Sequence, residues 1–320
     1  MPDNAAGEAG YGHLQRRRAA LRGHLAMLVF SALVAGSFSF GALVARDIAP
    51  VTLMALRFVL GAAMIAAIFA ATGRLRALRL ARPARFLLLG GIFAAYFLTM
   101  FEALRVAGPV PLAAIFTLTP LMTAVTARAI LGQRTGALNW LALAIGAAGA
   151  LWVIFRADLS ALLALRLGWG EKLFIFGSFL HALYVPLLRR FNQGEGPLAS
   201  TFGVLVGGAL VLLAWGWGDI RATDWAGLPI RVWLVLAYLM VFATVTTFSL
   251  VQYGAMRLPA SKVMAYTYLT PSFVIGWEVA LGHGVPPVAV LAGVGLTLVA
   301  LMILLGRDER PPQPSDASAR

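Results

Sequence analysis

The chain has 320 residues and a mass of 34.0 kDa, and 60% of its residues are apolar whereas only 12% are charged. An ordinary soluble domain carries about 25% charged residues, so this composition excludes a soluble globular protein and a disordered protein. It also excludes a nucleic-acid binder, despite the net charge of +13. The absence of cysteine excludes disulfides, cysteine-based metal sites and a cysteine nucleophile.

Ten apolar segments follow one another along the chain. A bilayer core of about 30 Å requires about 20 mostly apolar residues in a helix, and each segment can reach that length. The predicted spans are 24–45, 50–72, 84–104, 109–131, 136–155, 170–190, 198–218, 231–253, 259–281 and 286–306. The runs do not alternate apolar and polar residues as the strands of a membrane barrel do. We therefore predict an all-α, polytopic membrane protein with ten transmembrane helices.

The basic residues predict the orientation of these spans. With ten spans both termini lie on the same side, and placing them in the cytoplasm puts 18 of the 26 Lys and Arg residues inside and seven outside. This bias follows the positive-inside rule. Residues 1–23 and 307–320 are then short cytoplasmic tails, and we expect residues 1–21 and 307–320 to be disordered. The excess positive charge is also compatible with contacts to anionic lipid headgroups of the bilayer.

The sequence contains a weak internal repeat. When the chain is shifted by 151 residues, Leu118-Thr119-Pro120 aligns with Leu269-Thr270-Pro271, and Phe97 aligns with Phe248. Five spans in each half is an odd number, so the halves must lie upside down relative to each other. Inverted repeats are common in secondary transporters, with the substrate near mid-membrane between the halves. The alternative is that two Thr-Pro motifs arose independently.

The two prolines of this repeat predict gating elements. Pro120 and Pro271 lie inside predicted helices, where proline removes a backbone hydrogen bond and forces a kink. The freed carbonyl groups could face a cavity, with the hydroxyl of Thr117 beside them. The alternative for such threonines is that they satisfy the interrupted backbone locally, as is common in membrane helices.

Charged residues inside the spans are informative because burying one there costs about 2.5–3.5 kcal/mol or more. Arg57 could reach outward to pair with Asp47, or it could bind a substrate carboxylate. Glu278 could be an interfacial residue or could neutralise Arg57. Glu102 and Arg105 are three residues apart and are most simply an ion pair on one helix face.

Polar aromatic residues complete the candidate substrate site. His181 is the deepest titratable side chain, and histidine changes charge near neutral pH, so it could couple transport to protons or could simply be a neutral, hydrogen-bonded imidazole. Tyr184 is one turn away, Tyr96 and Phe97 lie in the third span, and Tyr268 adjoins the second kink. These rings suit amphipathic metabolites but could equally serve helix packing.

These residues also resemble a known family. The chain from about 24 to 306 is similar to the EamA-domain proteins of the drug/metabolite transporter superfamily. The motifs that carry the resemblance are Pro50…Arg57-Phe58, the Leu-Thr-Pro sequences at 118–120 and 269–271, the Leu-Gly pairs at 131–132 and 281–282, and Arg189-Arg190. The resemblance implies ten helices arranged as two repeats, here 24–155 and 168–306. Gln133 and His283 stand where the family often has Glu.

The resemblance implies a secondary transporter of small organic metabolites, amino acids or related compounds, which exports them across the bacterial inner membrane by alternating access. Protons are a candidate coupling ion. We find no hydrolase, metalloprotease or P-loop motif, so we predict no enzymatic activity, cofactor, metal site or nucleic-acid partner. The alternatives are a non-transporting structural or receptor-like membrane protein and an uncoupled facilitator. The oligomeric state is not predicted.

Overall fold

The computed structural model describes residues 3–78, 82–133, 135–164, 166–255, 257–258 and 260–306, and within these ranges it contains helices and no strands. The α-helices are α1 (Asp3–Val44), α2 (Pro50–Ala71), α3 (Ala84–Leu104), α4 (Pro109–Phe116), α5 (Thr119–Leu131), α6 (Ala137–Ile154), α7 (Leu159–Leu163), α8 (Trp169–Phe191), α9 (Pro197–Trp215), α10 (Trp217–Ala222), α11 (Ile230–Met240), α12 (Thr247–Ala255), α13 (Ala260–Ala265), α14 (Thr270–Ala280) and α15 (Val288–Leu305). Short helices of other types are the 3-10 turns η1 (Leu75–Leu78) and η3 (Tyr266–Leu269) and the π-helix η2 (Val241–Thr246).

The all-α membrane fold predicted from the sequence is confirmed. In the described part of the chain, nine helical segments are long and apolar enough to cross a bilayer. The remaining predicted span, 259–281, corresponds to α13, η3 and α14, which together cover 260–280 but are broken into three pieces. Ten spans are consistent with this arrangement. Several spans begin with Pro at the first helical position, where its missing N–H costs nothing.

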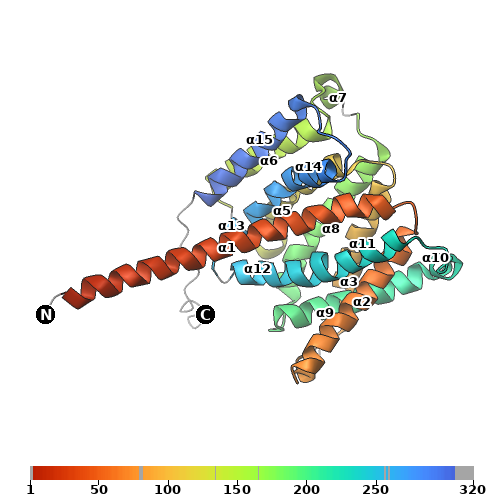
Figure 1. Ribbon diagram of the computed structural model, residues 1–320, viewed down its shortest axis with the longest axis horizontal. Coiled ribbons are helices and arrows are strands. Elements are labelled where there is room, and N and C mark those ends of the chain that lie inside the picture. The colour runs from red at the N-terminus through yellow and green to blue at the C-terminus, as the bar shows by residue number, and fades with distance from the viewer. Residues whose placement is uncertain are drawn as a thin grey trace.

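The prediction that residues 1–21 are disordered is wrong for residues 3–21. Helix α1 begins at Asp3 and continues without interruption to Val44, and Figure 1 shows its N-terminal part projecting from the bundle. Ala and Arg, which are strong helix formers, are frequent in this segment. Extending an existing helix also avoids the cost of a new nucleus. The predicted C-terminal tail, 307–320, lies outside the described residues.

Helix packing follows a pseudo-twofold plan. Helix α1 packs against α12 and α14, and α8, the first span of the second half, packs in the same way against α3 and α5. Two further pairs, α2 with α9 and α6 with α15, join equivalent helices of the two halves. Figure 1 shows these two pairs on opposite flanks, with α1, α3, α8 and α11 between them. Exchanging the halves therefore preserves the contacts, as inverted repeats require.

The two Thr-Pro motifs interrupt equivalent spans. Helix α4 ends at Phe116 and α5 begins at Thr119, so Pro120 is the second residue of the new helix. In the second half, η3 separates α13 from α14, and Pro271 is the second residue of α14. The expected kinks are thus short interruptions of the α-helical hydrogen bonding, through which the flanking residues keep helical backbone angles. Proline is favoured in the first turn of a helix because its nitrogen needs no partner there, so each motif restarts a helix in mid-span.

Glycine permits close backbone contact between the halves. A Cβ atom placed on Gly149 of α6 would lie 2.5 Å from the carbonyl oxygen of Gly293 on α15, and the reverse contact would be 2.6 Å. Any side chain here would therefore push the backbones apart. Close approach at small residues is a main source of helix association in membranes, where lipid is as apolar as a leucine surface.

The two ends of the bundle differ in composition. Helix α3 begins and α5, α8 and α12 end at what we call the basic end, which carries Arg85, Arg128, Arg189, Arg190 and Arg257. At the opposite end the side chains of Trp169, Trp215, Trp217, Trp225 and Trp233 are exposed. Exposed tryptophan is enriched where a membrane protein meets the lipid headgroups. The tryptophans therefore mark the membrane boundary at the opposite end.

Candidate functional site

Arg57 lies in the interior of the bundle, not at its surface. Its side chain projects from the middle of α2 and is only 2% exposed. The Nε and Nη2 atoms donate hydrogen bonds of 3.2 and 3.1 Å to Thr244 Oγ1, and Nη2 also donates to the Ala243 carbonyl oxygen at 3.2 Å. The guanidinium carbon lies 4.0 Å from the centre of the Phe97 ring. The suggested pairing with Asp47 is wrong, because Asp47 pairs with Arg231.

The π-helix η2 supplies the two acceptors that hold Arg57. A π-helix is rare and is often found at functional sites because it redirects backbone groups. Here it places Thr244 and the Ala243 carbonyl toward α2. The third guanidinium nitrogen, Nη1, is buried and has no hydrogen-bond partner among the described residues. Sequence analysis did not identify Thr244 or η2.

Aromatic rings connect Arg57 to His181. Phe97 contacts Tyr96 with ring centres 4.7 Å apart, and Tyr96 contacts the His181 imidazole at 4.7 Å. Tyr184 lies 6.3 Å from His181 and stacks on Phe93 at 4.6 Å. The structure thus brings together five predicted site residues, namely Arg57, Tyr96, Phe97, His181 and Tyr184, and we call them and Phe93 the central cluster.

Two rings of this region were missed. Phe93 lies one turn before Phe97 on α3, and Phe116, the last residue of α4, contacts His181 with ring centres 5.6 Å apart. The spacing of four residues between Phe93 and Phe97 was the available signal, because residues four apart share a helix face. The Nδ1 atom of His181 is buried without a hydrogen-bond partner among the described residues.

The predicted threonine and tyrosine beside the breaks occupy different surroundings. Thr117 Oγ1 donates a 2.7 Å hydrogen bond to the Ala114 carbonyl oxygen, so it satisfies the interrupted backbone locally. Tyr268 is fully buried, and its ring lies against Gly146, where a Cβ atom would come within 2.2 Å of it. Its hydroxyl group has no partner among the described residues.

A cavity of about 240 Å³ opens at the basic end. Pro120 and Thr123 line it from α5, Val185 and Arg189 from α8, and Tyr268 from η3. Val185 and Arg189 are four and eight residues beyond His181, so the three share one face of α8. The cavity therefore lies one to two helical turns from the central cluster along α8 and adjoins both mid-span breaks.

Glu278 does not neutralise Arg57. The Glu278 Oε2 and His283 Nδ1 atoms are hydrogen-bonded at 2.8 Å. The Glu278 side chain is nearly buried and lies close to the end of α14. Glu102 and Arg105 form the expected pair, with Nη1 and Oε2 3.1 Å apart. That pair is exposed and lies at the opposite end of the bundle, where Arg46, Glu102 and Arg105 line a shallow hollow.

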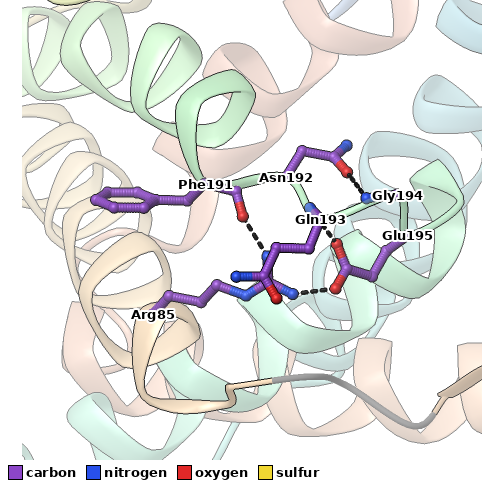
Figure 2. Close-up of polar contacts among 6 residues, drawn as sticks. All are labelled: Arg85, Phe191, Asn192, Gln193, Gly194 and Glu195. Carbon is purple, nitrogen blue, oxygen red and sulfur yellow. Dashed lines mark hydrogen bonds and ion pairs between the residues drawn. The ribbon is translucent and has the colours of Figure 1, made fainter.

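Two ion pairs occupy equivalent places at the two ends. Arg85 is the second residue of α3 and pairs with Glu195 in the loop before α9, and Arg85 also donates to the Phe191 carbonyl oxygen (Figure 2). Arg231 is the second residue of α11 and pairs with Asp47 in the loop before α2, at 2.6 and 2.8 Å. The pseudo-twofold axis relates α3 to α11 and α9 to α2, so it also relates these pairs.

Both carboxylates are held in their charged form. Hydrogen bonding from Arg231 lowers the pKa of Asp47. Burial acts to raise the pKa of Glu195, but hydrogen bonds from the Gln193 backbone N–H and from Arg85 outweigh it, and the pKa is lowered. Figure 2 shows the Glu195 carboxylate between these two donors.

Comparison with known proteins agrees with this architecture. Residues 21–155 and 168–306 each match the EamA-like transporter family. The chain is 28% identical over 284 residues to a protein of Bacillus subtilis (strain 168) described as "Uncharacterized transporter YyaM", covering 88% of this chain and 92% of that protein. A solved crystal structure superposes with a TM-score of 0.65 and 20% identity, covering 90% of this chain and 96% of the other. At that identity the superposition supports the fold alone.

Proposed function

Because the chain belongs to the EamA-like transporter family, we propose that this membrane transporter is a secondary transporter that moves small organic metabolites by alternating access. The observation that carries the proposal is the pseudo-twofold packing of two halves whose fourth spans are broken at equivalent positions. Inverted halves can rock about a site between them and expose it to one side at a time.

Substrate binds at the central cluster in this proposal. The cluster combines a buried cation, an imidazole and several aromatic rings contributed by α2, α3 and α8. Small-molecule sites are mostly apolar with a few placed polar groups, and the cluster has this composition. Broken helices serve such sites because their free backbone groups can face a cavity.

The two ion pairs act as closures at opposite ends. Arg85–Glu195 ties α3 to the loop before α9 at the basic end, and Arg231–Asp47 ties α11 to the loop before α2 at the opposite end. Alternating access requires that one end open while the other stays closed. Pseudo-symmetric pairs suit this requirement, because the pair at one end can break while the equivalent pair at the other end stays formed.

The distribution of basic residues supports an orientation in the membrane, and the family resemblance supports a direction of transport. We propose that the basic end and both termini are cytoplasmic, in keeping with the positive-inside rule, and that the protein lies in a bacterial inner membrane. Amino acids or related compounds are the expected substrates and export the expected direction. We expect no enzymatic activity and no cofactor. His181 has no acidic partner among the described residues, so a neutral imidazole is favoured over a proton carrier.

Flux measurement tests the proposal. The purified protein is reconstituted in liposomes and screened for exchange of radiolabelled amino acids, amines, aromatic acids and nucleosides. Saturable exchange of one class supports a transporter, whereas no exchange of any class supports the structural or receptor-like alternative. A flux that responds to the substrate gradient but to neither a pH gradient nor a sodium gradient identifies an uncoupled facilitator.

A further inference from the structure

We infer that Arg57 binds the carboxylate group of the substrate, and that the transporter therefore acts on small monocarboxylates with an apolar or aromatic body. This inference rests on the proposed function and specifies its substrate class. None of the ion pairs among the described residues includes Arg57, and Asp47, Glu102, Glu195 and Glu278 each pair with another residue.

An uncompensated cation inside a membrane protein is costly and usually marks a functional site. Arg57 is 2% exposed, so bulk solvent does not screen its charge. Two neutral acceptors and one aromatic ring contact the guanidinium. These contacts orient the group but carry no negative charge. A substrate anion would supply the missing charge during each transport cycle.

The free edge of the guanidinium is suited to a carboxylate. Thr244 and Ala243 accept from Nε and Nη2, while Nη1 has two N–H groups and no partner among the described residues. Charge-assisted hydrogen bonds from arginine to a carboxylate are about twice as strong as bonds between neutral groups. The fixed contacts at Nε and Nη2 hold Nη1 in place before the ligand arrives.

The pseudo-twofold axis provides an internal control for a purely structural role. Arg57 is the eighth residue of α2, and Val204 is the eighth residue of α9, its counterpart. Val204 is 1% exposed and packs with Phe86 and Leu89. An apolar residue therefore satisfies the packing at this position in the second half. Packing at this position therefore does not by itself require a cation, which favours ligand binding as the role of Arg57.

The surroundings also restrict the rest of the ligand. Phe97 lies beneath the guanidinium, and Tyr96 continues the ring surface to His181. A carboxylate held by the guanidinium would therefore lie beside an aromatic surface, which suits an apolar or aromatic ligand body. Phe97 is thirteen residues beyond the first residue of α3, and Ala243 is thirteen residues beyond the first residue of α11. Arg57 therefore contacts equivalent positions of the two halves, and so it lies where the halves meet. A ligand held there can be released toward either end.

Paired probes test this inference. Purified protein is titrated with phenylacetate and phenylacetamide, and with L-phenylalanine and L-phenylalaninamide, and binding is read from intrinsic tryptophan fluorescence and thermal shift. We expect each acid to bind the wild type at least tenfold more tightly than its amide. R57M should reduce this ratio to about one, R57K should retain part of it, and the exposed control R105Q should leave it unchanged. Without ligand, R57M should unfold at the same temperature or higher, because an apolar isostere of a buried charge is often stabilising.

The inference is overturned if the wild type binds neither acid better than its amide, or if R57M keeps the wild-type preference. It is also overturned if R57M and R57K both unfold at markedly lower temperature, since Arg57 would then be a structural tie between α2 and η2. A carboxylate preference that depends on Arg57, together with no flux of any probe, would support the binding site while contradicting the proposed transport. The two claims can therefore fail separately.

Discussion

Equivalent ion pairs lie at the two ends of the bundle in unlike surroundings. At the basic end, the Arg85 and Glu195 side chains are 7% and 10% exposed, and Arg85 also binds the carbonyl that ends α8 (Figure 2). At the opposite end, Arg231 is 60% exposed and Asp47 17%. The equivalent ion pair is therefore buried at one end and largely solvent-exposed at the other.

This difference in burial shows that equivalent positions in the fold need not contribute equally to stability. Inverted repeats place both pairs at matching positions, but only local burial decides how much each stabilises the closed end. Exposed pairs contribute little because water screens them, whereas removing one partner of a buried pair leaves an unsatisfied charge. We therefore expect the basic end to be the more firmly closed, and the opposite end to open more readily.

The largest predicted effect comes from breaking the buried pair. E195Q should lower the free energy of unfolding by about 2 kcal/mol, because the Arg85 guanidinium loses its charged partner in a nearly buried site. Chemical denaturation in detergent measures this value. The exposed carboxylate Glu102 provides the matched control, and E102Q should change stability by less than a quarter as much. Equal effects of the two variants would contradict the difference in burial.

The mid-span breaks should affect transport more than stability. P271A allows a continuous helix through 266–274 and should slow exchange about tenfold, because the two pieces of the ninth span would lose their independent movement. P120A probes the equivalent break beside the basic-end cavity. Initial rates of counterflow, normalised to folded protein, are the measurement. Wild-type rates in both variants would show that the breaks have no gating role.

Acidification should weaken both closures. The pKa values of Asp47 and Glu195 are lowered in the folded protein, so their stabilisation is present above the ordinary carboxyl pKa and is lost as pH falls through the lowered values. Between pH 7 and about 5 we expect little change, and below about 4.5 a falling unfolding temperature. E195Q should show a shallower fall than the wild type. A parallel fall would mean that Glu195 does not contribute.

D47N should have the smallest effect on stability. The Arg231 side chain is mostly in water, so loss of the pair should shift the unfolding temperature by much less than E195Q does. Its effect on the balance between the two open states can still be measured. A stability loss as large as that of E195Q would show that the opposite end is closed as firmly as the basic end.

Sequence reasoning located the spans and the repeat because both depend on local features. Run length and loop charge place α2, α3 and α6 within about two residues of their observed bounds, and Thr119-Pro120 marks a break that the structure confirms. The central cluster was predicted as separate residues, because their contacts join spans far apart in the chain. Thr244 was missed since a π-helix has no simple sequence signature, and the Arg85–Glu195 pair was missed since its partners are 110 residues apart.

Reciprocal opening of the two ends is the central claim, and the cysteine-free sequence permits a direct test. Single cysteines are introduced at Ala124, which lines the basic-end cavity, and at Leu173, which lines the hollow at the opposite end, and their labelling by an impermeant maleimide is measured in E195Q and D47N backgrounds. Alternating access predicts that E195Q raises labelling at 124 and lowers it at 173, and that D47N does the reverse. Labelling that rises or falls together at both positions would contradict it.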